Sequence, residues 1–563
     1  MPLPKAQRLH AAGQSSGDTS RRTAVFAGLG AAGKYAGNLA RDFRVMAYRN
    51  QRLIRPYSLE VPLKNADGVV DPSVTTSIDI LLPHESFAWL ASRGPAHFES
   101  RLCPGGWDSV SEWWKARREE PWYDQHPATQ LLNSDVKMLP MQLYGDDAEM
   151  HKGNSALVLT YSSPLCSMPS WHSKMLIAVV PLRLCGPETL ETIYACVRWS
   201  FDVLLGRRWP EHDCWGNVWQ DWRQHRAGEF LNPDMQCGAA VVRLLGDWKW
   251  LKESLGLTRY WKTRFICHLC CAVATIDKRG HGADMLYTDF GDEAGWRPTR
   301  MTHTQFLALF AACMFLPALL QLAGFHVSMA HPDVMHSFHL GFVGFAISSE
   351  LMVLCSRGHF GHFDGERLLR LKQALTVAFG RFRRHCRAHQ IEHSQQPFKP
   401  GVIGCSEAGT FPDWHGKAAN AKAVCYWLTV EMGEAAPPAE RALFGALTDV
   451  LRVLHRRPRV RLGRVERRDF YASGSAALRI YAVLNADAVS NAEALWPLRP
   501  KLHMVQHMLL EVRRTGNIPE WSFADEDFNG RVIRCEWTKG WSSTLPRRIC
   551  IKWALAKFRQ TRD

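Results

Sequence analysis

The sequence predicts a mixed α/β protein in which a sheet region is followed by a long, mainly helical region. Between residues 138 and 247, three apolar runs rich in β-formers, one run of helical period and a fourth β-type run follow one another. Beyond residue 247 the apolar residues recur mostly at helical spacing. Hydrophobic residues make up 46% of the 563 and charged residues 22%, which is a globular composition and excludes wholesale disorder, collagen and coiled-coil rods.

The segment that precedes the sheet region differs from this pattern. Residues 1–75 are polar, basic and rich in glycine, and they predict a partly disordered basic arm. Residues 76–135 are rich in tryptophan and proline and predict an irregular or helical lead-in. We therefore expect the sheet to begin near residue 136.

The sheet region is expected to occupy residues 136–275. Its predicted strands are 138–144, 155–162, 174–180 and 238–245. A helix is predicted over 189–205, between the third and fourth strands, because Pro187 is suited to its first turn. A glycine and then an aspartate follow the first and fourth strands, as Gly145-Asp146 and Gly246-Asp247.

A mainly helical segment is expected over residues 276–498. The helices predicted after the fourth strand are 248–256, 304–323, 335–355, 366–390, 438–456, 500–514 and 523–535, and a basic amphipathic tail covers 547–562. The strongest apolar run, 306–320, would rise only about 22 Å as a helix, against roughly 30 Å of hydrocarbon in a bilayer. We therefore expect a buried helix there, and no membrane association.

The balance of charge favours a polyanionic partner. The chain has 69 Lys and Arg against 54 Asp and Glu, a net charge of +15, which indicates nucleic acid before a membrane. Between residues 452 and 468 Glu466 is the only acidic residue among eight arginines: Arg452, Arg456, Arg457, Arg459, Arg461, Arg464, Arg467 and Arg468. Their irregular spacing predicts contacts with DNA phosphates and not with bases. A solvated surface is the alternative, and a nuclear import signal is compatible with either.

Asp146 and Asp247 are candidate ligands of a divalent cation. Carboxylates at the ends of neighbouring strands supply the hard oxygen ligands that suit Mg²⁺ or Mn²⁺. Two such ions can hold the attacking and leaving oxygens of a phosphodiester, but this chemistry needs a third acidic group from elsewhere in the chain. Aspartate after glycine is also common in turns, which is the alternative for each residue.

Cys267 and Cys270, at Cys-x-x-Cys spacing, are candidate metal ligands of a different kind. His503 and His507 are four residues apart on a predicted helix, so their rings share a face. Together the four residues form a Cys₂His₂ set suited to a structural Zn²⁺. Two core thiols and two unrelated histidines are the alternative.

Five segments, in order along residues 138–535, resemble motifs of eukaryotic cut-and-paste transposases of the CACTA (En/Spm-type) group. They are 143–149 (LYGDDAE), 244–247 (LLGD) with 267–270 (CHLC), 331–336 (HPDVMH), 501–507 (KLHMVQH) and 521–531 (WSFADEDFNGR). The resemblance implies an RNase H-like core of three strands, a helix and a strand. Residues 276–498 would be an insertion in that core, and 499–563 would complete it and add the basic tail.

The resemblance also implies the roles of individual residues. Asp146, Asp247 and Glu526 would form an Asp-Asp-Glu triad that holds Mg²⁺ or Mn²⁺, cuts DNA and joins the freed 3′-hydroxyl to target DNA. Asp147 stands where the family more often has glycine, so Asp147 is an alternative first ligand. Asp333 and His336 would be accessory residues. A nuclear location, DNA as partner and a homo-oligomer on the DNA ends are further expectations.

Two other functions remain open from the sequence. One is a domesticated or degenerate transposase that keeps the fold, binds DNA and has lost catalysis. The other is a metal-dependent nuclease on the same fold, with Asp147-x-Glu149 as its first motif, although Met150 stands where Thr or Ser is expected.

Overall fold

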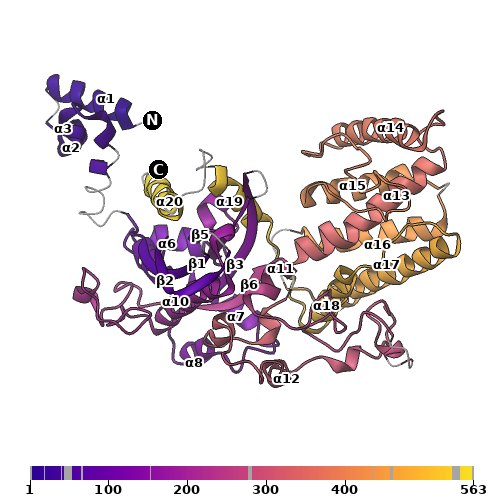
Figure 1. The fold of residues 1–563 in the computed structure, drawn as a ribbon, viewed down its shortest axis with the longest axis horizontal. Helices are drawn as coiled ribbons and strands as arrows, with labels where there is room; N and C mark the ends of the chain where they lie inside the picture. Colours follow the sequence, from indigo (N-terminus) through magenta and orange to yellow (C-terminus); the bar gives the residue numbers. More distant parts are fainter. Residues whose placement is uncertain are drawn as a thin grey trace.

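The computed structural model describes residues 3–17, 19–39, 41–43, 53–64, 68–151, 154–276, 280, 282–331, 333–434, 436–456, 461–534 and 545–560. Figure 1 shows a part that contains the sheets, drawn in indigo to magenta, beside a helical part drawn in orange. The C-terminal helices, drawn in yellow, return from the helical part to the sheets. Helices and strands share the chain, so the predicted α/β class is confirmed.

The central sheet has four strands in the order β5-β4-β3-β6. They are β3 (Met138–His151), β4 (Asn154–Ser162), β5 (Met175–Pro181) and β6 (Gly238–Gly246), and α10 (Pro187–Gly206) lies between β5 and β6 in the chain. β3, β4 and β5 pair antiparallel, whereas β6 pairs parallel to β3. Most residues of β4 and all of β5 are buried, as their continuous apolar sequences predict.

β3 continues beyond its predicted end at residue 144. Its parallel pairing with β6 stops at Gly145 opposite Gly246, but its antiparallel pairing with β4 continues to His151. Asp146 therefore lies inside a strand and directly beyond the last parallel pair. Gly145 is required there because the Trp250 ring occupies the space that a Cβ would need.

The described residues of 1–75 are more ordered than the sequence predicts. The described part of 1–75 contains α1 (Leu3–Ser15), α2 (Arg21–Ala27), α3 (Leu29–Ala32) and β1 (Tyr57–Lys64), and β1 pairs antiparallel with β2 (Val70–Ile80). Leu59, Val61 and Ile80 of this hairpin are fully buried. The lead-in is helical, with α5 (Pro83–Ala91), α6 (Pro95–Leu102), α7 (Gly106–Ala116) and α8 (Pro127–Asn133).

The helical part has its own hydrophobic core. It contains α13 (Gly344–Ser356), α14 (Arg367–Ala388), α15 (Ala418–Glu431), α16 (Pro438–Leu454) and α17 (Arg464–Ser490), and α18 (Pro500–Thr515) packs beside α17. A π-helix, Met335–Val343, precedes α13. The continuous helix Met335–Ser356 is long and apolar enough to cross a membrane, but 83% of its apolar window is buried inside the protein, as in a core helix.

The helix predicted over 304–323 is wrong. Only α12 (His303–Ala308) forms, and a short 3₁₀ turn, Ala318–Gln321, follows Pro317. Carboxylates of α10 hold the intervening backbone, because Glu191 accepts the N–H of Ala318 at 2.6 Å and Asp202 that of Ala323 at 3.4 Å. Tertiary contacts with α10 therefore replace the helical pattern that the apolar spacing predicts.

Three further helices flank the sheet. α11 (Trp248–Ser254) follows β6, α19 (Phe523–Arg534) packs near β3, and α20 (Leu545–Gln560) packs against β2 and β5. Cys550 and Trp553 of α20 are buried, so the described part of the basic tail packs against the sheets.

Candidate metal centres

Asp146, His336 and Glu526 converge from three distant parts of the chain. Asp146 lies on β3, His336 on the π-helix and Glu526 in the first turn of α19. One ligand atom from each lies within 4.8 Å of the others. Two carboxylates and an imidazole at this spacing form a suitable ligand set for a divalent cation such as Mn²⁺.

Two side chains hold the carboxylates in place. The Tyr144 hydroxyl lies 3.1 Å from Asp146 Oδ2 and 3.2 Å from Glu526 Oε1, and it accepts a hydrogen bond from Asn529 Nδ2 at 3.2 Å. Tyr144 precedes Asp146 by two residues, so both side chains share one face of β3. The sequence analysis missed Tyr144 and Asn529, although this period-two spacing was a usable signal for Tyr144.

A buried ion pair fixes the helix that carries Glu526. Lys174, just before β5, binds Asp525 at 2.7 Å and also donates to Ser162 Oγ at 3.0 Å. Both partners of the ion pair are almost fully buried. On the other side of Glu526, Asp527 accepts hydrogen bonds from Ser170 and Arg531. Glu526 is therefore held beside the sheet by its two neighbours in sequence.

Asp333 orients His336. Its Oδ2 accepts hydrogen bonds from the His336 backbone N–H at 2.9 Å and the Ser522 hydroxyl at 2.9 Å, and it lies 3.0 Å from His336 Nδ1. The opposite ring nitrogen, Nε2, lies 3.5 Å from Glu526 Oε1. A carboxylate behind an imidazole in this way fixes the ring and raises its basicity as a ligand.

The pKa values in this centre are strongly shifted. Burial and the nearby Glu526 carboxylate raise the pKa of Asp146 to about 9. Burial opposes the charge on His336, but its hydrogen bond to Asp333 and the nearby carboxylates outweigh burial and raise its pKa to about 9. A divalent cation placed among these groups would favour the ionised carboxylate and the neutral imidazole, and so lower both pKa values.

We expect Mn²⁺ binding at this centre to strengthen steeply as the pH rises from about 6 to 9. Below their pKa values of about 9, Asp146 and His336 both carry protons that a cation must displace. Each displaced proton contributes about tenfold in affinity per pH unit. Displacement of both protons therefore strengthens binding about a hundredfold per pH unit. Calorimetric titration in buffers of different ionisation enthalpy would count the protons, and a pH-independent affinity would contradict this assignment.

Asp247 and Asp147 have different surroundings. Asp247 caps α11, where its carboxylate accepts a hydrogen bond from the Trp250 N–H at 2.6 Å. It lies outside the group formed by Asp146, His336 and Glu526, but it is close enough to raise the pKa of Asp146. Asp247 directly follows β6, and the last parallel pair, Gly145 with Gly246, immediately precedes both Asp146 and Asp247. Asp147 points to the other face of β3 and pairs with Lys249. The structure thus brings Asp146, and not Asp147, together with Glu526.

Cys267, Cys270, His503 and His507 form a second cluster. Cys267 Sγ lies 3.4 Å from His507 Nε2, Cys270 Sγ lies 3.2 Å from His503 Nε2, and the two Nε2 atoms are 3.1 Å apart. A tetrahedral zinc with Zn–S of about 2.3 Å and Zn–N of about 2.05 Å requires S···N of about 3.5 Å and N···N of about 3.3 Å. The four buried side chains could therefore hold a metal ion almost without rearrangement.

The surroundings of the cysteines favour metal-bound sulfur. The N–H groups of Leu269 and Ala272 donate to Cys267 Sγ and Cys270 Sγ, at 3.2 and 3.4 Å. Burial and the neighbouring Cys267 raise the pKa of Cys270 to about 11, so a cation would be needed to hold its thiolate form at neutral pH. The Trp296 ring covers His503, with ring centroids 4.4 Å apart.

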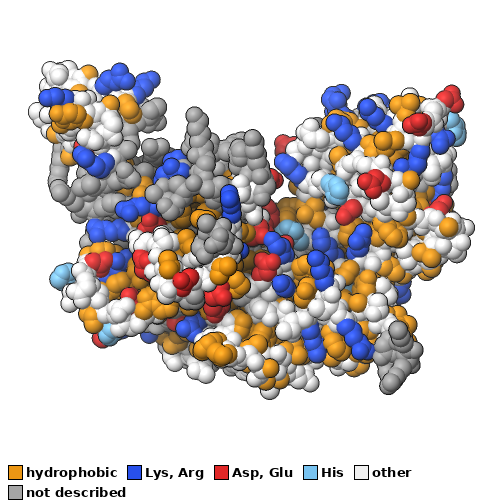
Figure 2. Space-filling view, in the orientation of Figure 1, with side chains coloured by type: hydrophobic (Ala, Val, Ile, Leu, Met, Phe, Trp, Pro, Cys, Tyr) orange, Lys and Arg blue, Asp and Glu red, His pale blue; other side chains and the backbone are white. Residues whose placement is uncertain are grey.

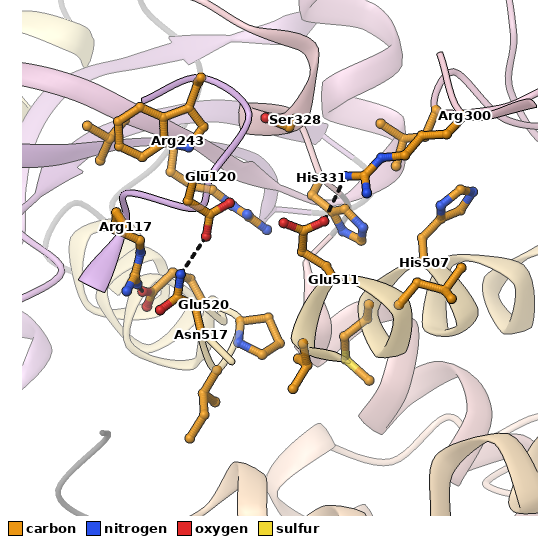
Figure 3. Close-up of a pocket in the computed structure, with 18 of the residues that line it drawn as sticks. Arg117, Glu120, Arg243, Arg300, Ser328, His331, His507, Glu511, Asn517 and Glu520 are labelled. Carbon is orange, nitrogen blue, oxygen red and sulfur yellow. Dashed lines mark hydrogen bonds and ion pairs between the residues drawn. The ribbon is translucent and has the colours of Figure 1, made fainter. Parts of the chain in front are cut away.

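A pocket between the lead-in and α18 reaches the Cys₂His₂ cluster. Figure 3 shows His507 at one end of this pocket and Arg243 and Glu120 toward the other. Glu511 pairs with Arg300 at 2.7 Å, and Asn517 donates to Glu120 at 2.7 Å. Of the four residues of the cluster, His507 therefore lines the pocket.

The arginines predicted to bind DNA divide into four groups. Arg457 and Arg459 lie outside the described residues. Arg461 and Arg467 bind carbonyl oxygens at the end of α18, those of Thr515 and Arg514, and both pair with Glu119. Arg456 pairs with Glu466 at 2.5 Å. The exposed arginines are Arg452, Arg464 and Arg468, of which Arg452 and Arg468 each pair with an exposed aspartate.

Comparisons of this chain with protein-family models and with curated proteins were made. No protein-family model matches the chain, and no curated protein matches it. The function must therefore be argued from the two centres and their surroundings.

Proposed function

We propose that this protein is a metal-dependent, transposase-like enzyme that cuts and joins DNA phosphodiesters. The observation that carries the proposal is the convergence of Asp146, His336 and Glu526 beside the carboxyl end of β6. The two carboxylates come from distant parts of the chain, and hydrogen bonds of Asp333 and Tyr144 support the group. Because burial and Glu526 raise the pKa of Asp146, this ligand set needs a cation to be fully ionised at neutral pH.

The sheet supports an RNase H-like core for this enzyme. Three antiparallel strands with a fourth strand parallel to the first, reached through a helix, give the order expected for that core. The helical part enters between β6 and α19, so residues 276–498 occupy the place of the predicted insertion. The Cys₂His₂ cluster would hold a structural Zn²⁺ and tie residues 267–270 to α18.

The residues of the chain suit phosphodiester cleavage. Asp146, Glu526 and His336 would hold Mg²⁺ or Mn²⁺, with Asp247 as an adjacent carboxylate for a second ion. Bound metal lowers the pKa of an attacking water and neutralises charge on the phosphate. Tyr144 and Asp333 keep the ligands in position, and Lys174 balances the charge of Asp525 beside them.

Nicking of a supercoiled plasmid in Mn²⁺ tests the proposal. We expect the wild-type protein to nick the plasmid and to lose this activity in EDTA. A protein that binds DNA but never nicks it would instead be the inactive DNA-binding derivative. The nuclease that uses Asp147-x-Glu149 is disfavoured, because Asp147 pairs with Lys249 and lies outside the group of three.

We expect the exposed arginines to strengthen binding to all DNA sequences alike. Replacing Arg452, Arg464 and Arg468 with glutamine should reduce the slope of log K against log[salt] by about 0.9 for each duplex phosphate that is no longer neutralised. Fluorescence anisotropy with two unrelated duplexes would measure this slope. A change of sequence preference in the triple variant would contradict phosphate binding. Substitution of Arg461 or Arg467 should lower stability as well, because these two residues bind α18.

A nuclear location and an oligomer on DNA ends are part of this proposal, since cutting and joining of chromosomal DNA needs access to two ends. The net charge of +15 supports a DNA partner.

A further inference from the structure

A cavity of about 320 Å³ opens beside the carboxylate centre. It lies among α11, the π-helix and the start of α18, and His336 and Asp247 form part of its wall. Pockets that take small ligands typically measure about 300–1,000 Å³, so there is room for one nucleotide. The cavity thus shares a wall with the proposed reaction centre.

Basic and acidic side chains share the wall of this cavity, and Asp247 and Asp413 act electrostatically on Lys501. Lys249, Arg499 and Lys501 line the cavity, against the carboxylates of Asp247 and Asp413. Lys249 is already paired with Asp147. The Lys501 ammonium makes no hydrogen bond or ion pair with any residue that the structure describes, and its side chain lies along the π-helix at Gly341. Lys501 is therefore available to an anion that enters the cavity.

Two tryptophans form the apolar wall. Trp248 and Trp261 lie edge to face, with ring centroids 5.4 Å apart. Trp248 is 8% exposed and fixed at the start of α11, whereas Trp261 is half-buried. A tryptophan ring that lines a cavity can stack a base, and such stacking is tolerant of base identity.

The surface between the sheet part and the helical part is suited to a DNA strand. Figure 2 shows a hollow between the sheet part and the helical part, with acidic side chains toward the sheets and basic side chains toward the helices. A DNA strand in this hollow would have its phosphates near the basic side.

We propose that this cavity binds the nucleotide adjacent to the scissile phosphodiester, with its phosphate on Lys501 and its base against Trp261 and Trp248. The inference rests on the proposed function, because the scissile phosphate is placed at Asp146 and Glu526. The inference specifies the substrate of the proposed enzyme as a DNA strand in which one nucleotide is unstacked from its neighbours. Base stacking would position the strand without requiring a particular sequence.

An abasic-site walk tests the cavity. Single-stranded or nicked oligonucleotides with one abasic position each are compared with the intact oligonucleotide for Mn²⁺-dependent cleavage. The wild-type protein should lose about five- to a hundredfold at one position next to the cut. Trp261→Ala should cleave the intact oligonucleotide as slowly as the wild type cleaves the oligonucleotide with that abasic position. In this variant the abasic position should cause no further loss. Trp215→Ala, at a site 49% exposed outside the cavity, should behave as wild type.

Lys501→Gln provides a second variant, in case loss of Trp261 impairs folding. It should weaken binding and reduce the salt slope by about 0.7, the value for one phosphate of a single strand. Lys262→Gln, at an exposed position next to Trp261 and outside the cavity, is the matched control. An unchanged salt slope in Lys501→Gln would overturn the phosphate contact.

Binding in Ca²⁺ separates this inference from the proposed function. If the wild type does not cleave, fluorescence anisotropy of the same oligonucleotides still reports the cavity. An abasic effect on binding that Trp261→Ala removes would support the cavity although cleavage has failed. Equal abasic effects in wild type and Trp261→Ala, in cleavage or in binding, would overturn the cavity and leave the proposed function intact.

Discussion

Replacing Asp146 with asparagine is expected to lower Mn²⁺-dependent nicking by at least about a thousandfold. The substitution removes one of two carboxylates that meet at the centre and leaves an amide, a much weaker ligand for a hard cation. A catalytic cation supplies several kcal/mol of transition-state stabilisation, and each step of about 1.4 kcal/mol is tenfold in rate. Nicking rates of the purified variant, normalised to DNA binding, measure the effect.

Asp147→Asn is the matched control for this experiment. Asp147 is the next residue on β3, but it faces away from the centre and pairs with Lys249. We expect its nicking rate to stay within about threefold of wild type. The reverse result, an active Asp146→Asn protein and an inactive Asp147→Asn protein, would move the first ligand to Asp147 and contradict the geometry of the centre.

The second large effect is expected from the Cys₂His₂ cluster. Replacing Cys270 with serine should abolish stoichiometric zinc and lower the melting temperature by about 10 °C or more. Structural zinc in small peptides binds with about 10–16 kcal/mol, comparable to the whole stability of a domain. Elemental analysis and thermal unfolding, with and without a chelator, measure the two effects.

Cys271→Ser is the control for the zinc experiment. Cys271 adjoins Cys270 but is partly exposed and lies outside the cluster. The protein with this substitution should keep one zinc per chain and the wild-type melting temperature. If the wild-type protein contains no zinc and is no more stable than the Cys270→Ser variant, the cluster is only a group of buried thiols and imidazoles.

The strands and the two separate ligand pairs, Cys267 with Cys270 and His503 with His507, follow from local sequence signals. Four apolar β-type runs predict the strands, and the short spacings within the two ligand pairs predict their shared faces. The β1-β2 hairpin was missed because residues 1–75 as a whole are polar and basic, although Leu59 and Val61 alternate with Ser58 and Glu60 at the period of a strand. The 304–323 helix was wrong because Glu191 and Asp202, more than a hundred residues earlier, hold that backbone in another conformation.

The carboxylate centre shows a second limit of local reasoning. Spacing after strands predicts Asp146 and Asp247 equally, but only the structure shows that Asp247 caps α11 while His336 faces Glu526. The position of His336 depends on the π-helix and on the hydrogen bonds of Asp333. Neither is visible as a periodicity in the sequence.

Anomalous diffraction at the manganese edge, from crystals soaked in MnCl₂, tests the central claim most directly. The claim is that Asp146, His336 and Glu526 form a divalent-cation centre. We predict an anomalous peak within about 2.3 Å of a ligand atom from each of the three residues. Manganese found only elsewhere, or absent while Asp146 and Glu526 stay joined through a shared proton, would contradict the claim.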